Sequence, residues 1–339
     1  MPTPVLLTID TELVWRHHAA GRSWEENFAR SYEAAGVGVP YQLRVLNEHG
    51  LKACFFVDPM PALAFGLDPV RRMVEPILAA GQEVQLHLHP FWADLARAER
   101  LRQTPELASF GYDQQLDLLG RARDLLVAAG APQPTAFRAG SYAANADTLR
   151  ALADLGLRYD SSHNGCYHPS PSALPLPPGQ VAPLRTAPGV VEIPVSQIRE
   201  GEGKLRHLQI CAVSFLELRS ALREAQRREH PLVTIVSHSF ELASRDGLRP
   251  NGVLRRRFER LCRFLAQHSA ALPTSRFSDL EDLPLSCAAD PPPGRSALRL
   301  GRAASQVWVG SRYERPGETM TAATGTTILA AEAILLYVL

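Results

Sequence analysis

The chain has 339 residues, of which 45% are hydrophobic and 21% charged, a composition that is ordinary for a folded globular protein. A formal net charge of +1 gives no electrostatic reason for nucleic-acid binding, and we expect none. The five cysteines are scattered and form neither a CxxC pair nor a disulfide framework. Together with the lack of a signal peptide, this pattern favours a cytoplasmic location.

Alternating strand and helix patterns predict an α/β protein. Apolar runs predict strands at 4–10, 53–57, 83–89, 135–138, 157–162, 190–195 and 232–241. Spacing of apolar residues predicts helices at 39–49, 70–80, 112–129, 147–155, 214–228 and 251–267, and a last helical turn at 277–283. This order predicts parallel strands joined by right-handed crossovers.

Three stretches of this region lack such a pattern. Residues 13–38 are expected to be irregular, with Trp15 and other aromatic side chains either lining a ligand cleft or packing within the loop. Residues 91–110 are interpreted as a surface excursion. Residues 163–189, rich in Pro, Ser and Gly, are interpreted as a long loop over the mouth of the sheet.

The character of the sequence changes after residue 285. We predict a catalytic domain over residues 1–285, followed by a linker and a C-terminal tail over 286–339. The proline-rich run at 290–294 is typical of a linker, and the residues after it show no clear period. Residues 328–339 are apolar but shorter than the ~20 residues that span a bilayer, so no stable membrane insertion is expected.

Polar side chains stand where the predicted strands end. Asp10 and Glu12 follow the first strand, and His87 and His89 end the third, where a period of two puts both imidazoles on one face. Three further strand ends carry Arg138, Asp160 and His238. Because parallel strands point one way, we expect these ends to meet on one face, which is where α/β barrels place their active sites.

This combination of side chains predicts metal-assisted hydrolysis. One carboxylate and two imidazoles make a three-ligand metal site with room for water. A second carboxylate could take a proton from that water, and a further histidine could protonate a leaving group. Taken singly, each motif has a simpler interpretation: Asp10 could cap a helix, and the two histidines could end a strand half-exposed.

With these motifs, residues 4–283 resemble the polysaccharide deacetylase (NodB-homology) family, whose fold is a distorted (β/α)7 barrel. The family's Thr-Phe-Asp-Asp motif corresponds to residues 8–12, which read Thr-Ile-Asp-Thr-Glu. Its His-x-x-x-His-Pro motif corresponds to the His-Leu-His-Pro of residues 87–90, which is two residues shorter. Its Arg-x-x-x-Tyr motif matches residues 138–142, and its later Asp and His correspond to Asp160 and His238.

The resemblance implies a role for each matching residue. Asp10 would be the general base, Arg138 would steady it, His238 would be the general acid, and Asp160 would tune that histidine. The family's second Asp is replaced by Thr11, so the metal would pass to Glu12, His87 and His89. The metal is a divalent ion, most often zinc in this family. The expected substrate-binding residues are Tyr142, Trp15 and Trp92.

The implied activity is removal of an N-acetyl group from a sugar or glycan. One alternative is a metal-free hydrolase of cyclic amides, because allantoinase-like relatives share the fold. Another is a glycan-binding protein without catalysis, in which the altered first and second motifs have lost their chemistry. The retention of Asp10, Arg138, Asp160 and His238 together favours the deacetylase.

Overall fold

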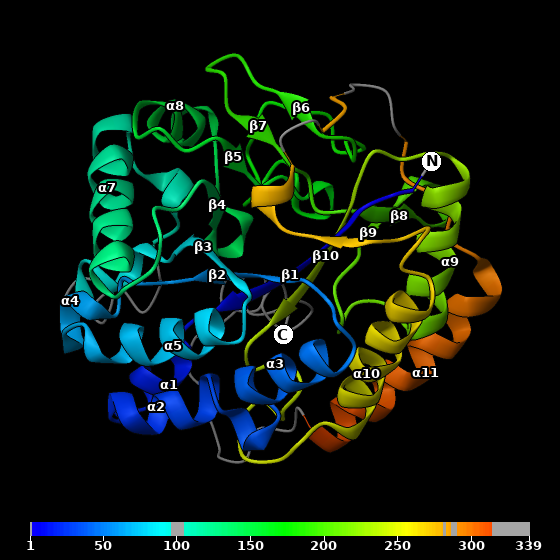
Figure 1. Ribbon diagram of the computed structural model, residues 1–339, viewed down its shortest axis with the longest axis horizontal. Helices are drawn as coiled ribbons and strands as arrows, with labels where there is room; N and C mark the ends of the chain where they lie inside the picture. The colour runs from blue at the N-terminus through cyan, green and yellow to red at the C-terminus, as the bar shows by residue number, and fades with distance from the viewer. Residues whose placement is uncertain (1, 96–104, 281–282, 286–289, 314–339) are drawn as a thin grey trace, which may run out of the picture.

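The computed structural model describes residues 2–95, 105–280, 283–285 and 290–313 (Figure 1). Its strands are β1 Val5–Thr11, β2 Cys54–Val57, β3 Glu83–Leu88, β4 Ala136–Ala139, β5 Tyr159–Asp160, β6 Leu184–Arg185, β7 Val191–Glu192, β8 Gln197–Arg199, β9 Leu205–His207, β10 Val233–His238 and β11 Thr274–Ser275. Its α-helices are α1 Trp15–Ala19, α2 Trp24–Ser31, α3 Val39–Glu48, α4 Ala62–Phe65, α5 Asp68–Ala79, α7 Tyr112–Ala128, α8 Ala146–Asp154, α9 Phe215–Arg227, α10 Gly252–Gln267 and α11 Ser296–Tyr313.

A curled, mostly parallel sheet forms the centre of the molecule. The strand order is β10-β1-β2-β3-β4-β5-β7-β6, and only β6, at the edge, pairs antiparallel on this path. Segment 195–210 bridges β7 to β10: the N–H of Ser196 donates to the carbonyl of Thr234 at 3.2 Å, and the N–H of Val236 donates to that of Leu208 at 2.9 Å. The predicted α/β fold, a distorted barrel of parallel strands, is confirmed.

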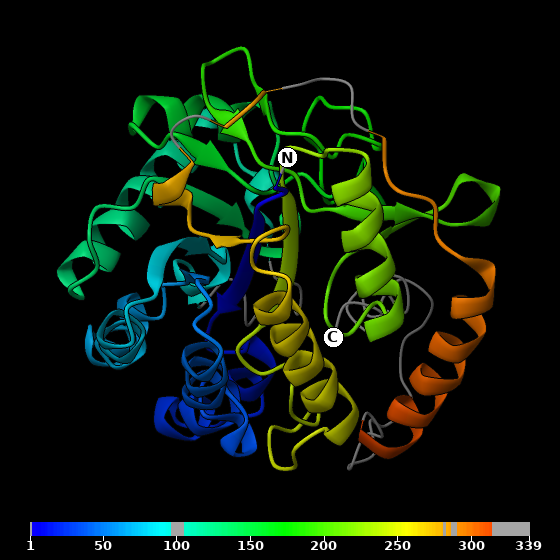
Figure 2. The same ribbon diagram turned by 45° about the vertical axis from the view of Figure 1, so that its right-hand side comes forward.

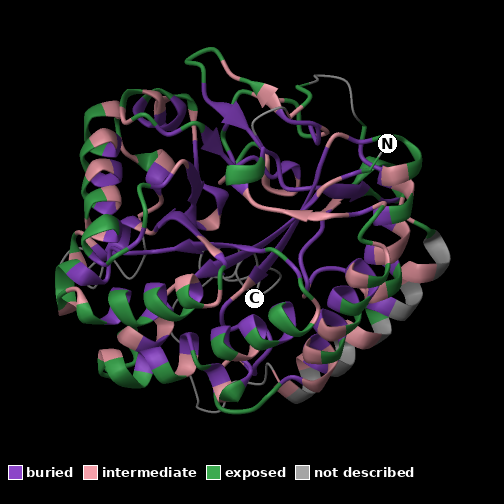
Figure 3. Cartoon of the chain, in the orientation of Figure 1, coloured by how far each residue is buried: buried purple, intermediate pink, exposed green. Residues whose placement is uncertain are grey.

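The central strands β1 and β2 of this sheet are buried on both faces (Figure 3). Successive side chains along β1 point to opposite faces of the sheet and pack into two different apolar clusters, as a period of two requires. Leu6 lies inside the curled sheet, where it belongs to the same apolar cluster as Phe56 and Phe277. Val5 and Leu7 face outward and belong to the larger core under the helices. This double burial explains why the strand sequences are continuously apolar rather than alternating.

Two segments predicted to be irregular or exposed differ in the structure. Residues 13–38 contain α1 and α2, so the prediction of an irregular loop was wrong there. Ser23 begins α2 with a capping box: its hydroxyl accepts from the N–H of Glu26, whose carboxylate accepts from the N–H of Ser23. In the stretch 91–110, Phe91 and Trp92 are buried rather than on the surface, and residues 96–104 lie outside the described part.

The hairpin β8–β9 and helix α11 were not predicted. The linker at 290–294 lies against β8, where the N–H of Gly294 donates to the carbonyl of Arg199 at 2.7 Å. Helix α11 then runs along the outer side of α9 (Figure 2), held by the buried Arg302, which contacts Glu200 at 2.6 Å and Glu217 at 2.9 Å. The domain boundary at residue 285 stays a prediction, and residues 328–339 lie outside the described part.

No helix within the described residues is both long and apolar enough to cross a membrane.

Candidate active site

A cavity of about 180 Å³ opens at the carboxyl ends of the parallel strands. Most of the predicted site residues line it, and they come from separate strands or the loops that follow them. From β1, β3, the turn after β4, and β10 it receives Asp10, Glu12, His87, His89, Tyr142 and His238. The parallel sheet therefore brings together motifs that are more than 200 residues apart in the sequence, as the direction of the strands predicted.

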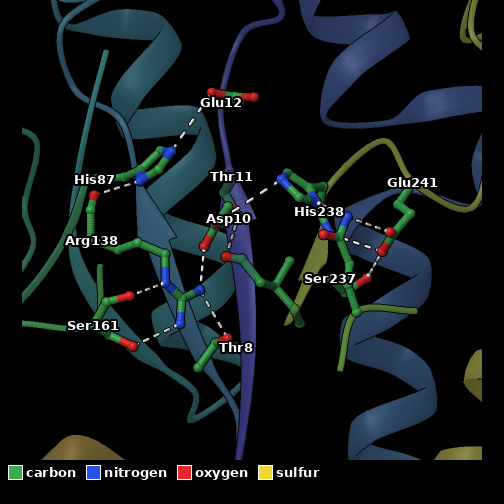
Figure 4. Close-up of polar contacts among 12 residues, drawn as sticks. Thr8, Asp10, Thr11, Glu12, His87, Arg138, Ser161, Ser237, His238 and Glu241 are labelled. Atoms are coloured by element: carbon green, nitrogen blue, oxygen red, sulfur yellow. Dashed lines mark hydrogen bonds and ion pairs between the residues drawn. The ribbon is translucent and has the colours of Figure 1, made fainter. Parts of the chain in front are cut away.

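Arg138 forms the floor of this site and holds Asp10 (Figure 4). Its side chain is fully buried, and Nη1 donates to Oδ1 of Asp10 at 2.7 Å and to the hydroxyl of Thr8 at 2.9 Å. Nε and Nη2 donate to the carbonyl and hydroxyl of Ser161 at 3.1 and 3.0 Å. The guanidinium also lies 4.4 Å from the ring centroid of Phe56. This fixed network compensates the buried carboxylate and sets its orientation.

Glu12, His87 and His89 form a cluster with the chemistry of a metal site. One ligand atom from each lies within 4.8 Å of the others. Oε2 of Glu12 is 2.5 Å from Nε2 of His89 and 3.8 Å from Nε2 of His87. The shortened spacing of the two histidines does not separate their rings, whose centroids are 5.0 Å apart. A carboxylate with two imidazoles suits zinc and similar divalent ions.

The protonation states of these three side chains also suit a metal site. The neighbouring histidines, acting against burial, hold the pKa of Glu12 down at about 2, so its carboxylate is ionised at neutral pH. Burial lowers the pKa of His87 to about 4, so its imidazole is neutral. Burial also acts to lower the pKa of His89, but the adjoining Glu12 carboxylate outweighs burial and raises it to about 9. A bound cation would displace that proton.

The orientation of both imidazoles is set by contacts with strand β4 and the turn after it. Nδ1 of His87 is 2.7 Å from the carbonyl of Arg138. A carbonyl only accepts, so Nδ1 carries the hydrogen and Nε2 presents its lone pair toward Glu12, the usual outer support of a metal-binding histidine. His89 packs on Gly140, where a Cβ atom would lie 2.4 Å from the ring. These residues therefore fit a metal.

His238 lies on the opposite side of Asp10 from His87 (Figure 4). Its Nε2 is 3.9 Å from Oδ2 of Asp10. The side-chain amide nitrogen of Gln209 is 3.3 Å from Nδ1 of His238 and donates to the carboxylate of Glu241 at 2.9 Å. Because the contact with Glu241 fixes which amide atom is the nitrogen, Nδ1 of His238 accepts and the hydrogen of the neutral ring is on Nε2, facing the cavity.

Asp160 is not placed where the resemblance implied. It pairs in register with Phe137 and Glu192, so all three point to the outer face of the sheet, whereas Arg138 points inward. Its Oδ1 accepts from the hydroxyl of Ser162 at 2.6 Å, and burial raises its pKa. The partners of His238 are Gln209 and Glu241 instead. We correct the expected role of Asp160 accordingly: it packs behind the sheet.

The three predicted substrate-binding residues differ in their placement. Tyr142 lines the cavity; it has a φ of +59°, in the left-handed region that is unusual for a non-glycine residue. Trp15 also lines the cavity, from α1. Trp92 is only 2% exposed and packs against Trp15 with a centroid distance of 5.3 Å. The expectation that Trp92 contacts substrate is corrected: it supports Trp15 from behind.

Sequence analysis missed several polar residues of the site. Asp58 follows β2 directly, and burial raises its pKa to about 7. The strand-end rule that found Asp10 applies to it as well, because it stands directly after β2. Glu106, Arg16 and Arg245 also line the cavity. They come from helices and loops outside the sheet, and no pattern in the sequence pointed to them.

Comparisons with known proteins were made for the whole chain. No protein-family model matches, and no curated protein matches. Among solved structures, a provisionally assigned polysaccharide deacetylase from Mycobacterium smegmatis is similar with 17% identity, 96% of each chain covered and a TM-score of 0.50. A family 4 carbohydrate esterase from Streptomyces lividans, in complex with acetate, is similar with 16% identity, covering 85% of this chain and 98% of that one, with a TM-score of 0.41.

A CE4 family pseudoenzyme from Bacillus anthracis is similar with 13% identity, covering 83% of this chain and 66% of that one, with a TM-score of 0.42. The match to the Mycobacterium smegmatis structure over nearly the full length of both chains shows the fold. The resemblance inferred from the motifs is therefore confirmed for the architecture: the chain has a divergent form of the polysaccharide deacetylase barrel.

Proposed function

We propose that this protein is a metal-dependent hydrolase that removes an N-acetyl group from a sugar or glycan. The observation that carries the proposal is the joint placement, around one cavity, of three kinds of group. These are a carboxylate fixed by a buried arginine, a Glu-His-His donor set, and a histidine with a hydrogen directed inward. Metal-assisted amide hydrolysis uses a base, a Lewis acid and an acid that act on the same amide.

Glu12, His87 and His89 would hold the ion, for which zinc is our first choice. When bound, such an ion lowers the pKa of a water molecule and polarises the amide carbonyl. Asp10 accepts the proton of the attacking water, and Arg138 keeps its carboxylate in place. Tyr142 and Trp15 border the space left for the sugar.

His238 would donate the proton that the leaving amine requires as an imidazolium, protonated on both ring nitrogens, and would return to the neutral ring. Its Nε2 faces Oδ2 of Asp10 at 3.9 Å, too far for a hydrogen bond. The proposed acid and base therefore lie side by side without pairing, and both line the cavity where the reacting amide would bind. Gln209, which is held by Glu241, orients the ring so that Nε2 faces the cavity.

Metal content and acetate release test the proposal. Wild-type protein should carry about one zinc or similar ion per chain, and His87→Ala and Glu12→Ala should each lose it, because a three-ligand site seldom survives the loss of one ligand. Asp10→Asn should keep the ion and lose acetate release from N-acetylated sugars. An Asp10→Asn variant with normal turnover would refute the assignment of the base.

The other outcomes point to the alternatives. Protein that takes up no zinc, cobalt or nickel but hydrolyses cyclic amides, insensitive to chelators, would be the metal-free hydrolase. Protein that binds glycans and releases no acetate would be a binding protein without catalysis.

A further inference from the structure

Two arginine side chains line this cavity and form no hydrogen bond or ion pair with a carboxylate of the described residues. Arg16 comes from α1 and Arg245 from the loop between β10 and α10. Nε of Arg16 donates to the main-chain carbonyl of Arg245 at 3.0 Å, which joins the two segments. Neither guanidinium has a role in the proposed proton transfers, so their presence in the cavity needs another explanation.

Arg16 is largely withdrawn from water. Burial, followed by the nearby charge of Arg245, lowers its pKa to about 10 against the attraction of Glu12 and Asp246, so it stays cationic at neutral pH. Its guanidinium carbon lies 5.4 Å from the ring centroid of Phe240. Its Nη1 atom is buried and has no hydrogen-bond partner in the described part of the chain. A buried donor without an acceptor costs free energy, and this cost would be removed by a bound acceptor.

Arg245 is anchored through its backbone, which leaves its side chain available. Its N–H donates to the carbonyl of Tyr313 at 3.3 Å, and its own carbonyl accepts from Arg16. The half-buried guanidinium makes no hydrogen bond or ion pair with any residue that the structure describes. A cation held at a cavity wall in this way is placed to meet a ligand.

The carboxylates of the cavity are already engaged elsewhere. Asp10 is paired with Arg138 at 2.7 Å, and Glu12 is paired with His89 at 2.5 Å. Glu106 hydrogen-bonds Ser141, and burial raises its pKa. The guanidinium groups of Arg16 and Arg245 are therefore a local excess of positive charge, although the whole chain has a formal net charge of only +1.

From this excess charge, and resting on the deacetylase proposed above, we propose that the substrate carries an oxyanion, phosphate or carboxylate, which binds Arg16 and Arg245 while the N-acetyl group lies at the Glu12–His87–His89 cluster. Planar guanidinium groups bind both oxyanions through paired hydrogen bonds. The protein would then act on an anionic amino sugar rather than on a neutral chitin-like chain.

Equilibrium binding in the Asp10→Asn background tests this inference without requiring turnover. Calorimetry compares four probes: neutral N-acetylglucosamine, its 1-phosphate, its 6-phosphate, and N-acetylmuramic acid, which carries a carboxylate. At least one anionic probe should bind about 10-fold or more tightly than the neutral sugar, with the gap narrowing at high salt. The preferred probe identifies the oxyanion as phosphate or carboxylate.

Substitutions then assign the preference to the arginines. Arg245→Gln should lower the affinity for the anionic probe roughly 10- to 100-fold and change the affinity for the neutral sugar by no more than about twofold. Arg245→Lys should lower the affinity for the anionic probe by a smaller factor. Arg16→Gln should act in the same direction. Arg121→Gln is the matched control, since Arg121 is an exposed residue of α7 paired with Asp117 at 3.5 Å.

Two results would overturn the inference: wild-type-like preference in Arg245→Gln, or no anionic probe binding more tightly than the neutral sugar. Acetate release by the Asp10-containing enzyme is measured separately. Tight binding of an anionic probe without acetate release would therefore refute the proposed activity but support the proposed anion site.

Discussion

Replacing Arg138 by Met should be among the most damaging single changes in this protein. The variant keeps the apolar stem but removes the guanidinium that compensates Asp10 at 2.7 Å. The Asp10 side chain is 4% exposed, so water cannot replace the lost partner. The carbonyl of Ser161 and the hydroxyl of Thr8 lose a donor as well.

The size of the effect follows from burial. Breaking a buried ion pair by removing one partner costs about 3–5 kcal/mol of unfolding free energy, because an uncompensated charge remains in the interior. The lost hydrogen bonds to Ser161 and Thr8 are already included in this free-energy cost. Acetate release should fall to background, because Asp10, the proposed general base, loses the group that orients it.

Urea unfolding and a double-mutant cycle measure the pairing directly. Asp10→Asn removes the charge that Arg138→Met leaves unpaired, so the double variant should be more stable than the sum of the two single effects predicts, by about 1–3 kcal/mol. Combining Asp10→Asn with Arg302→Met is the control. Arg302 is also buried but pairs with Glu200 and Glu217, so those two effects should add.

A cost of less than about 1 kcal/mol for Arg138→Met would contradict the reasoning, since it would mean that Asp10 is solvated or neutral in the folded protein. Strict additivity with Asp10→Asn would do the same.

Three further changes test other parts of the structure. Gly140→Ala should lower zinc affinity about 10- to 100-fold, because the new Cβ would lie 2.4 Å from the His89 ring; the control, Gly120→Ala in α7, meets nothing nearer than 3.6 Å and should leave affinity unchanged. Because the pKa of His89 is raised to about 9, its proton must leave when metal binds, so apparent zinc affinity should rise about tenfold per pH unit between pH 6.5 and 8, and a flat profile would contradict this. Arg302→Met should release α11 to limited proteolysis at neutral pH. In wild type, the neighbouring guanidinium groups of Arg206 and Arg302, acting against burial, lower the pKa of Glu200, so its ion pairs are intact throughout and above the ordinary glutamate range. The same release in wild type should therefore require a pH below that range. Equal protection of wild type and variant at neutral pH would count against this reasoning.

The order of strands and helices in the barrel, and most of the residues of the candidate site, could be predicted from local patterns. Continuous apolar runs identified the buried strands, and the common direction of parallel strands placed Asp10, His87 and His238 on one face. The period of two correctly put His87 and His89 together. These features depend only on the order of residue types within a few positions, which can be read directly from the sequence.

Tertiary structure decided to which face of the sheet some side chains point and which residues they contact. Asp160 and Ser161 are neighbours in sequence, and only the register of β5 against β4 turns Ser161 toward Arg138 and Asp160 away from it; a one-residue shift would exchange them. The arginine pair could not be foreseen either, because Arg16 and Arg245 are 229 residues apart and meet through loops and helices outside the sheet. Side chains brought together by packing, rather than by a repeating pattern, leave no periodic signal in a single sequence.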